Sequence, residues 1–225
     1  LTATRVTIED NGGFGIAFEQ KIPETVAKTP RLPLPIPVRM GLVGENGTPV
    51  PFRLAPDALF AEEHVVLISG ETHLQPVFPK TTSKVVPSLL RNFSAPVILR
   101  DDLTPSERLH LLAHDVDMFN RWDAAQTLVA DQILAVVIDP KGSVDELAMM
   151  ALGNVLADGL ANSGLLDMFK AGLLTLPAIS VLEGRLKPAD PIALFYARRK
   201  VEAELGRILT PKISEVLARH SVLAD

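Results

Sequence analysis

The sequence predicts a two-domain fold in which an N-terminal β-sandwich is followed by an α-helical domain. Its 225 residues exceed the usual size of one domain, and 47% of them are hydrophobic, which is enough for two cores. Up to about Arg100, Pro, Gly or Asn separates short β-branched or alternating runs, a pattern typical of strands. From Asp101 onward, apolar residues recur at three- and four-residue spacing behind helix-start signals.

The first part of the chain contains several short candidate strands, and their number in that length favours a sandwich. Glu45-Asn46-Gly47 predicts a hairpin turn, because Asn-Gly tolerates positive φ. Asn11-Gly12-Gly13 also predicts a turn, in preference to an anion-binding nest. The candidate strands are Arg5–Glu9, Gly15–Gln20, Ile36–Leu42, Val50–Leu54, His64–Ser69, Thr72–Phe78 and Pro96–Arg100.

Pro33, Pro35 and Pro37 repeat with period two. In an extended strand they remove the backbone donors from one side only, so this segment can pair along a single edge. Protection of the other edge against aggregation is the favoured interpretation. The alternative is a Pro-rich peptide ligand, but ligands of SH3-type domains prefer PxxP spacing.

Helix-start signals recur after Asp101. Some place a capping side chain before a Pro at the first helical position, and others have capping-box spacing or a variant of it. We expect about five or six helices, packed mostly as antiparallel neighbours. The signals are Thr104-Pro105 with Glu107, Asp190-Pro191, Thr210-Pro211, Ser143 with Glu146, and Asn120 with Asp123.

Composition and charge exclude several classes of function. The formal net charge is −5, and neither half has the basic stripe that nucleic-acid binding needs. The absence of Cys excludes disulfides, thiolate metal sites and cysteine nucleophiles, and it fits a cytoplasmic location. No run approaches the ~18 apolar residues of a membrane span, and Leu1 opens no signal peptide. We therefore expect neither nucleic acid nor membrane as a partner. We also expect that the chain is trimmed from a larger protein.

The most tempting titratable pair is His110 and His114, which have the spacing of two zinc ligands on one helix face. A zinc protease also needs a Glu directly after the first His, where Leu111 stands, and a further acidic ligand. Asp117 could complete only a weak, adventitious site. We interpret both histidines as structural or surface residues. We predict no catalytic, substrate-binding or metal-binding residue in this chain.

The other titratable residues carry no predicted chemistry. His64, His73 and His220 are isolated, and neither a Ser-His-Asp order nor a phosphate-binding loop stands out. The acidic pairs Asp101-Asp102 and Glu62-Glu63 are expected to be solvated charges in linkers or at helix starts.

Arg121-Trp122-Asp123 places a large aromatic side chain between opposite charges, shortly after Phe119. This cluster predicts packing and capping: the aromatic rings anchor a corner, Asp123 favours a helix start, and Arg121 covers apolar surface. We expect Trp122 to be largely buried where the first two helices meet.

Four further segments follow one another along nearly the whole chain. They are Phe93-Ser94-Ala95-Pro96-Val97, Phe119-Asn120-Arg121-Trp122-Asp123-Ala124-Ala125-Gln126, Leu174-Thr175-Leu176-Pro177 and Asp190-Pro191-Ile192-Ala193. In these segments the sequence resembles bacterial aminopeptidase N, the alanyl aminopeptidase of the gluzincin family of zinc metallopeptidases. The second segment is more specific than the first.

The resemblance implies a fold, and it implies that the family's catalytic motifs lie outside this chain. In that family a catalytic domain is followed by a small sandwich and a large helical superhelix. It implies an Ig-like β-sandwich at residues 1–101 and the N-terminal part of a superhelical, solenoid-like domain at residues 102–225. The family's zinc signature, H-E-x-x-H, and its Gly-Ala-Met-Glu-Asn substrate motif belong to the catalytic domain, and neither occurs here. No zinc, catalytic or substrate role therefore carries over to any position.

The function implied by the resemblance is that of a non-catalytic structural fragment. The parent would remove N-terminal residues from peptides with a zinc-activated water, and these domains would shape or cover its active-site chamber. The expected partners are the catalytic domain of the same polypeptide and, for the parent, peptide substrates. The mean hydropathy of +0.23 predicts self-association of the isolated chain. A freestanding β-sandwich and helical protein-interaction module is the alternative.

Overall fold

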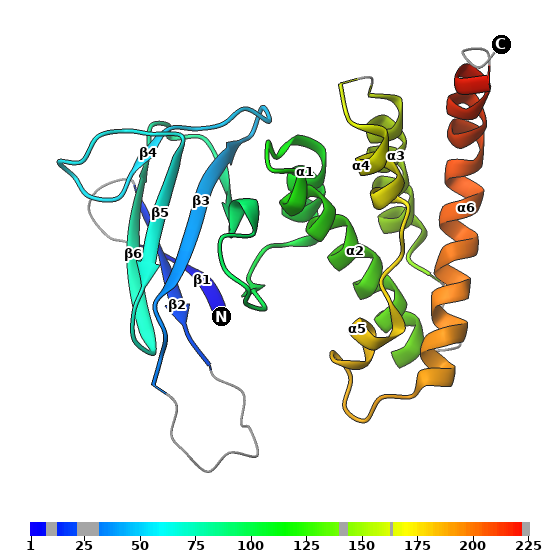
Figure 1. The fold of residues 1–225 in the computed structure, drawn as a ribbon, viewed down its shortest axis with the longest axis horizontal. Coiled ribbons are helices and arrows are strands. Elements are labelled where there is room, and N and C mark those ends of the chain that lie inside the picture. Colours follow the sequence, from blue (N-terminus) through cyan, green and yellow to red (C-terminus); the bar gives the residue numbers. More distant parts are fainter. Residues whose placement is uncertain (8–12, 22–31, 140–143, 163, 222–225) are drawn as a thin grey trace. The chain divides into compact units, whose positions relative to one another are not determined.

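The computed structural model describes residues 1–7, 13–21, 32–139, 144–162 and 164–221. Its strands come first and its helices follow, as the sequence predicts (Figure 1). The chain divides into two compact units, Leu1–Asn120 and Arg121–Asp225, which we call the first and second units. In the part that the structure describes, no helix combines the length and the apolar character needed to cross a membrane.

The first unit contains a β-sandwich of two sheets. The five-stranded sheet has the order β4-β6-β2-β1-β8, and the three-stranded sheet has the order β5-β3-β7. Alternate residues of the strands point between the sheets and form the core, which includes the fully buried Phe18, Phe52 and Ile68. The strands are β1 Thr2–Thr7, β2 Phe14–Glu19, β3 Ile36–Gly44, β4 Phe52–Arg53, β5 Glu63–Ile68, β6 Thr72–Pro79, β7 Val85–Leu89 and β8 Arg100–Asp101.

Most of the predicted strands overlap observed ones, but the last prediction is wrong and β7 was not predicted. Only Arg100 of the segment Pro96–Arg100 lies in a strand. β7 contains Pro87, and proline is rarely found inside a sheet. Pro87 lies opposite Leu42, whose carbonyl accepts from Val50 on the other side of β3. Proline is tolerated there because its missing N–H would point away from β3.

Of the proline repeat, Pro37 lies in a strand and pairs along one edge, as predicted, whereas Pro33 and Pro35 precede β3. Pro37 lies in β3 opposite Leu67 of β5, whereas the pairing of β3 with β7 begins only at Met40. On the side away from β5, the N–H of Arg39 donates to the hydroxyl of Ser94 at 3.0 Å. Because backbone groups alternate along a strand, the missing donor of Pro37 lies on that same side. Proline and Ser94 together close this stretch of edge.

The predicted hairpin turn at residues 45–47 is confirmed. The N–H of Gly47 donates to the carbonyl of Gly44 at 2.8 Å, and Gly47 has a φ of +80°. A Cβ at Gly47 would also lie 2.6 Å from Nδ1 of His114. Both the positive φ and this close approach therefore require glycine. Asn11 and Gly12 of the other predicted turn lie outside the described residues.

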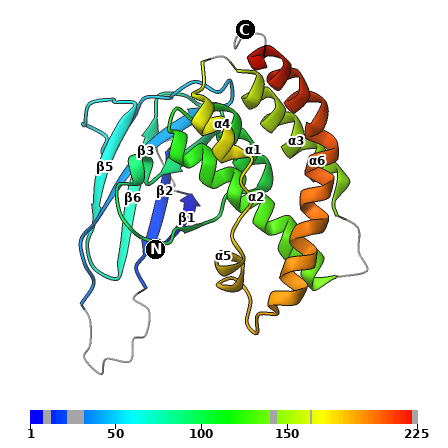
Figure 2. The ribbon, with the colours of Figure 1, turned by 45° about the vertical axis from the view of Figure 1, so that its right-hand side comes forward.

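Helices fill the rest of the chain. In the second unit α3 and α6 run side by side (Figure 2), and they pack tightly at Gly153, where a Cβ would lie 2.5 Å from Ile208. Fully buried side chains of this unit include Ile133, Met149 and Leu182. The helices are α1 Pro105–His114, α2 Met118–Ile138, α3 Glu146–Ala161, α4 Asp167–Leu173, α5 Ile179–Glu183 and α6 Pro191–Ser221.

Two of the predicted helix starts are confirmed. Thr104 caps α1 in a complete capping box. Its side chain accepts from the N–H of Glu107, and the Glu107 side chain accepts from the N–H of Thr104. Oδ1 of Asp190 accepts from the N–H groups of Ile192 and Ala193, each at 3.0 Å, at the start of α6.

The start predicted at Thr210-Pro211 is wrong, because Pro211 lies inside α6. The hydroxyl of Thr210 donates to the carbonyl of Gly206 at 2.6 Å, so this side chain bonds backward along a continuing helix and caps nothing.

The starts predicted at Asn120 and Ser143 are also displaced. α2 already begins at Met118, and Asp117 accepts from the N–H of Asn120 at 2.8 Å, so Asp117 has the capping role. α3 is capped by Asp145; Ser143 itself lies outside the described residues.

α1 follows the last strand after three residues and belongs to the first unit by its contacts, which include β7. The sequence placed a domain boundary between residues 101 and 102, and that division into 1–101 and 102–225 stays a prediction. The compact first unit runs on to Asn120.

Candidate functional site

The N-terminal end of α1 is held to β1 by a group that we call the Glu107 cluster: Arg5, Asp102, Thr104 and Glu107. Nη1 and Nη2 of Arg5 donate to the two carboxylate oxygens of Glu107 at 2.7 and 2.9 Å. Glu107 is only 4% exposed, and it also accepts from the N–H and hydroxyl of Thr104. The hydrogen bonds from Arg5, opposed by burial and aided by Thr104, lower the pKa of Glu107 to about 2.

Of the acidic pairs expected to be solvated, Glu62 is exposed, but the other three residues form ion pairs. Asp102 accepts from the backbone N–H and the Nε of Arg5, at 2.9 and 3.1 Å. Asp101 forms an ion pair with Arg108 of α1. Glu63 pairs with Arg39 across β3 and β5 at 3.1 Å. These carboxylates therefore fasten elements to one another.

The C-terminal end of α1 is held by a second group, the Arg91 cluster: Ser88, Arg91, Asp115, Asp117 and Asn120. Arg91 is 2% exposed; its Nε donates to the Ser88 hydroxyl at 2.8 Å and its Nη2 to Oδ1 of Asp115 at 3.0 Å. Asp115 is buried as well, and burial raises the pKa of its carboxyl group although Arg91 opposes that shift.

Asn120 and Asp117 join the first turn of α2 to the segment after β7. Nδ2 of Asn120 donates to the Ser88 hydroxyl and to the carbonyl of Leu89, at 2.8 and 2.9 Å. The two carboxylate oxygens of Asp117 accept from the N–H groups of Asn120 and Asn92, each at 2.8 Å. The corner between α1 and α2 is thus hydrogen-bonded to residues 88–92.

Unusual backbone geometry brings Arg91 inward. Leu90, Asn92 and Phe93 all have positive φ, between 50° and 58°, a region that side chains other than Gly, Asn and Asp rarely occupy. The guanidinium lies against Gly41 of β3, where a Cβ would be 2.0 Å from Nη1 of Arg91. The absence of a side chain at Gly41 therefore makes room for the guanidinium of Arg91.

The structure brings His110 and His114 together but places Asp117 elsewhere. The two imidazole rings lie 4.9 Å apart, and Nε2 of His110 is 2.8 Å from the carbonyl of Gly44. Both oxygens of Asp117 are bonded to backbone N–H groups. Among the described residues there is no group of three or more His, Asp or Glu that could hold a metal ion.

The isolated histidines lie in different parts of the sandwich. Nε2 of His64 is 2.8 Å from the carbonyl of Phe52, and its ring packs edge-on against the Phe52 ring at 4.6 Å. His73 lies in β6 with its ring 6.4 Å from that of Phe18. The side chain of His220 lies outside the described residues.

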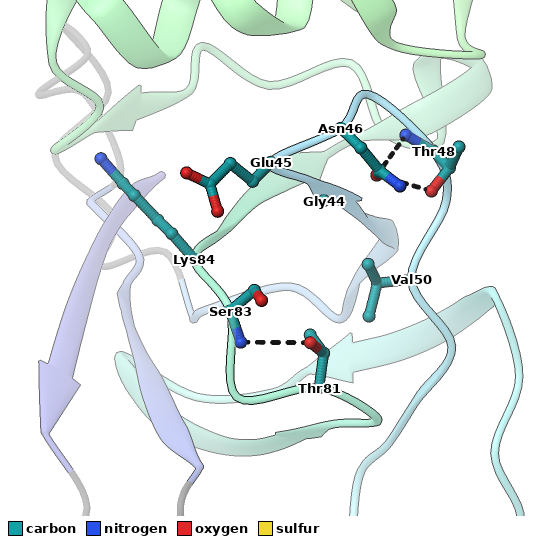
Figure 3. A pocket seen from close by; sticks show the side chains of 8 residues that line it. All are labelled: Gly44, Glu45, Asn46, Thr48, Val50, Thr81, Ser83 and Lys84. Atoms are coloured by element: carbon teal, nitrogen blue, oxygen red, sulfur yellow. Dashed lines mark hydrogen bonds between the residues drawn. The ribbon is translucent and has the colours of Figure 1, made fainter.

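A surface hollow of about 430 Å³ lies between the turn after β3 and residues 81–84 (Figure 3). Its polar groups include Glu45, Asn46, Thr48 and Lys84. Asn46 accepts from the N–H and hydroxyl of Thr48, and the ammonium of Lys84 lies 3.4 Å from Oε1 of Glu107. These side chains support the turn and the cluster, and among the described residues that line the hollow there is no nucleophile paired with a base.

Two contacts join segments on which the family resemblance rests: the first and second segments meet in the first unit, and the second and third meet in the second unit. Phe93 packs edge-on against Phe119, with ring centroids 5.2 Å apart. In the second unit, Nε2 of Gln126 donates to the carbonyl of Thr175 at 2.6 Å. Asp190 caps α6, as described above. The resemblance thus rests on residues that join elements.

The sequence predicts that Trp122 is largely buried, and in the structure it is partly buried on α2. One of its neighbours is Gly172 of α4, where a Cβ would lie 3.9 Å from Cδ1 of Trp122. The guanidinium of Arg121 lies 5.6 Å from the ring centre of Phe169, also in α4, and so it covers apolar surface as predicted.

Comparison with known proteins assigns both parts of the chain. Residues 105–224 match the family described as a domain of unknown function, DUF3458_C, with ARM repeats. The chain belongs to this family. Residues 1–102 match its companion family, DUF3458, which has an Ig-like fold. The predicted order of an Ig-like sandwich and a solenoid-like helical domain is therefore confirmed.

Individual relatives support the same assignment. The chain is 34% identical over 160 residues to aminopeptidase N of Caulobacter vibrioides, covering 69% of this chain and 18% of the relative. It is 29% identical over 225 residues to aminopeptidase N of Escherichia coli, covering 96% and 25%. The predicted resemblance to aminopeptidase N is confirmed, and the chain spans a quarter or less of these relatives.

A solved structure shows the same fold. The crystal structure of Legionella pneumophila aminopeptidase A in complex with aspartic acid superposes with a TM-score of 0.73. The match covers 97% of this chain and 23% of that chain, at 22% identity. At this identity the likeness establishes the fold.

Proposed function

We propose that this chain is a non-catalytic, structural segment of a zinc aminopeptidase that removes N-terminal residues from peptides. The observation that carries the proposal is the match to aminopeptidase N over 18% to 25% of that protein's length. The zinc would be held elsewhere in the parent, where it would supply an activated water for peptide hydrolysis.

The geometry of the first unit supports a structural role. Its buried charged groups, Arg91, Glu107, Asp115 and Asp117, are hydrogen-bonded to oppositely charged side chains or to backbone groups. Catalytic acids and bases need an open side on which a substrate can be placed. Groups arranged as these are hold α1 and the start of α2 against the sandwich.

In the parent, we propose, these domains shape or cover the active-site chamber in the cytoplasm, and their partner is the catalytic domain of the same polypeptide. Large apolar side chains remain exposed in both units, among them Leu59 at 88%, Leu147 at 81% and Met168 at 82%. Such side chains fit surfaces that are covered in a longer protein, and they also support self-association of the isolated chain. A freestanding interaction module would use the same surfaces for a separate partner.

Hydrolysis of alanyl and leucyl chromogenic amides, with and without zinc, tests this function. We expect no turnover by this chain, and zinc-dependent turnover by a full-length polypeptide that contains it. A variant of the chain with His110 and His114 both changed to Ala is the matched control. Turnover by the repurified chain that disappears in this variant would show that the two histidines are catalytic. A full-length polypeptide without turnover would favour the interaction module.

A further inference from the structure

Most strand edges of the sandwich are protected. β4 and β8 have two residues each. β7 is largely buried and carries Pro87, and the open stretch of β3 has Pro37 and the Ser94 bond to Arg39. β6 carries Pro76. Short strands, prolines and covering elements are the usual means by which proteins prevent unwanted strand pairing.

β5 differs from these strands. Its six residues, Glu63–Ile68, pair only with β3 among the described residues, and they include neither Pro nor Lys. Glu63 is turned to Arg39 of the neighbouring strand. Val65 and Leu67 lie on the outer face and are 56% and 57% exposed. β5 therefore presents a long strand edge beside an apolar surface.

The alternation of the ladder identifies the backbone donors on this edge. Val65 lies opposite Arg39, and Leu67 lies opposite Pro37. Arg39 directs its N–H away from β5, to Ser94. Opposed residues of an antiparallel pair either exchange both hydrogen bonds or neither, so Val65 and Leu67 direct their N–H groups away from β3. These two donors point along the open edge.

We propose that the β5 edge, residues Glu63–Ile68, is a pairing site for an extended strand from the remainder of the same polypeptide. The inference rests on the proposed function, in which this chain is a segment of a longer enzyme. The chain spans 25% or less of its aminopeptidase relatives, so most of a polypeptide of that size lies outside it. A strand of about five residues with alternating apolar side chains would bond to both outward donors, which have no partner among the described residues, and cover Val65 and Leu67.

Hydrogen exchange in this chain and in the full-length polypeptide tests the proposal. In this chain, the amides of Val65 and Leu67 should exchange rapidly, while those of Val66 and Ile68, which face β3, are protected. In the full-length polypeptide, exchange at Val65 and Leu67 should slow by about two orders of magnitude. Equal, rapid exchange at both residues in the two proteins would overturn the proposal. Protection that appears in this chain and rises with its concentration would also overturn it, because the occupant would then be a second copy.

Val65→Pro gives a second test, because it removes one outward donor without removing a ladder bond to β3. In the full-length polypeptide this variant should lose the protection of the Leu67 amide. Val65→Thr, which keeps the donor and the β-branched shape, should retain it. Protection at Val66 and Ile68 shows in both variants that β5 is still folded. If Leu67 stays protected in Val65→Pro, no strand is paired there. Turnover measured on the same full-length preparation tests the proposed function separately.

Discussion

Both ends of α1 are tied to the sandwich by an arginine and a carboxylate. The two carboxyl groups differ in the direction in which folding shifts their pKa. The pKa of Glu107 is lowered to about 2, with the hydrogen bonds from Arg5 as the largest cause. The pKa of Asp115 is raised, with burial as the largest cause. Ionised Glu107 therefore stabilises the fold, whereas the ionised form of Asp115 carries a desolvation cost that Arg91 offsets only in part.

The difference comes from access to water and from the number of donors. The side chain of Arg5 is 27% exposed and reaches both oxygens of Glu107, and Thr104 adds two further bonds. Arg91 is nearly without solvent and donates to Asp115 through a single bond. We infer that the Glu107 cluster contributes stability and that the Arg91 cluster fixes one geometry for the corner between α1 and α2.

The largest expected effect follows from removing one member of the buried pair. Arg91→Met should lower the free energy of unfolding by about 3–5 kcal/mol, because Asp115 is left buried without its cation. The double variant Arg91→Met with Asp115→Leu should regain most of that loss, since apolar side chains of similar size often replace a buried ion pair at little cost. Urea unfolding measures both. A double variant as unstable as the single one would show that the pair is itself a large source of stability.

Glu107→Gln should lower the free energy of unfolding at neutral pH by roughly 2–3 kcal/mol, a figure reduced for the partial exposure of Arg5. The pKa of Glu107 is lowered from 4.5, so its stabilisation is present above about pH 4.5 and is lost as the pH falls toward 2. The cost of the substitution should shrink over that range.

The cost of Asp115→Asn in free energy of unfolding should depend on pH in the opposite direction to that of Glu107→Gln. Because the pKa of Asp115 is raised, the folded chain holds this proton more tightly than the unfolded chain does, and the group's contribution improves as the pH falls. The cost of Asp115→Asn should therefore grow toward acid pH. Unfolding experiments over a pH series compare the two variants. If the costs of both substitutions changed with pH in the same direction, the two clusters would not differ as we infer.

Gly41→Ala should have a smaller effect, about 1–3 kcal/mol, because the new methyl group would displace the guanidinium of Arg91. Gly206→Ala is the matched control: nothing lies within 4 Å of a Cβ there, and the helical position favours alanine. Thermal unfolding should show a lower midpoint for the first variant and an unchanged or higher one for the second. A neutral Gly41→Ala would mean that Arg91 does not lie against β3.

Local signals predicted most of the fold. The capping box at Thr104, the Asp190 cap and the turn at Gly47 act over a few residues, and all are confirmed. The errors arise where tertiary context overrides a local signal. Pro87 is accepted in β7 because its position needs no donor, and Pro211 lies within a helix whose neighbouring Thr210 bonds backward.

The two clusters could not be predicted from the sequence. Arg5 and Glu107 lie 102 residues apart, and Arg91 and Asp115 lie 24 apart, so no local pattern links either pair. The segment that begins at Phe93 was recognised through the family resemblance, but this gave no role to Arg91. Only the strand pairing and the positive φ values at Leu90 and Asn92 bring the cluster together.

α1 and the corner after it are part of the sandwich unit. Comparing the unfolding of two truncated chains, residues 1–120 and residues 1–102, tests this assignment most directly. The longer chain keeps both clusters, and we expect it to unfold in one cooperative transition. The shorter chain loses Glu107 and Asp115 and leaves Arg91 without its carboxylate, so it should be partly unfolded or markedly less stable. Equal stability and equally cooperative transitions for the two chains would contradict the account and place the boundary where the strands end.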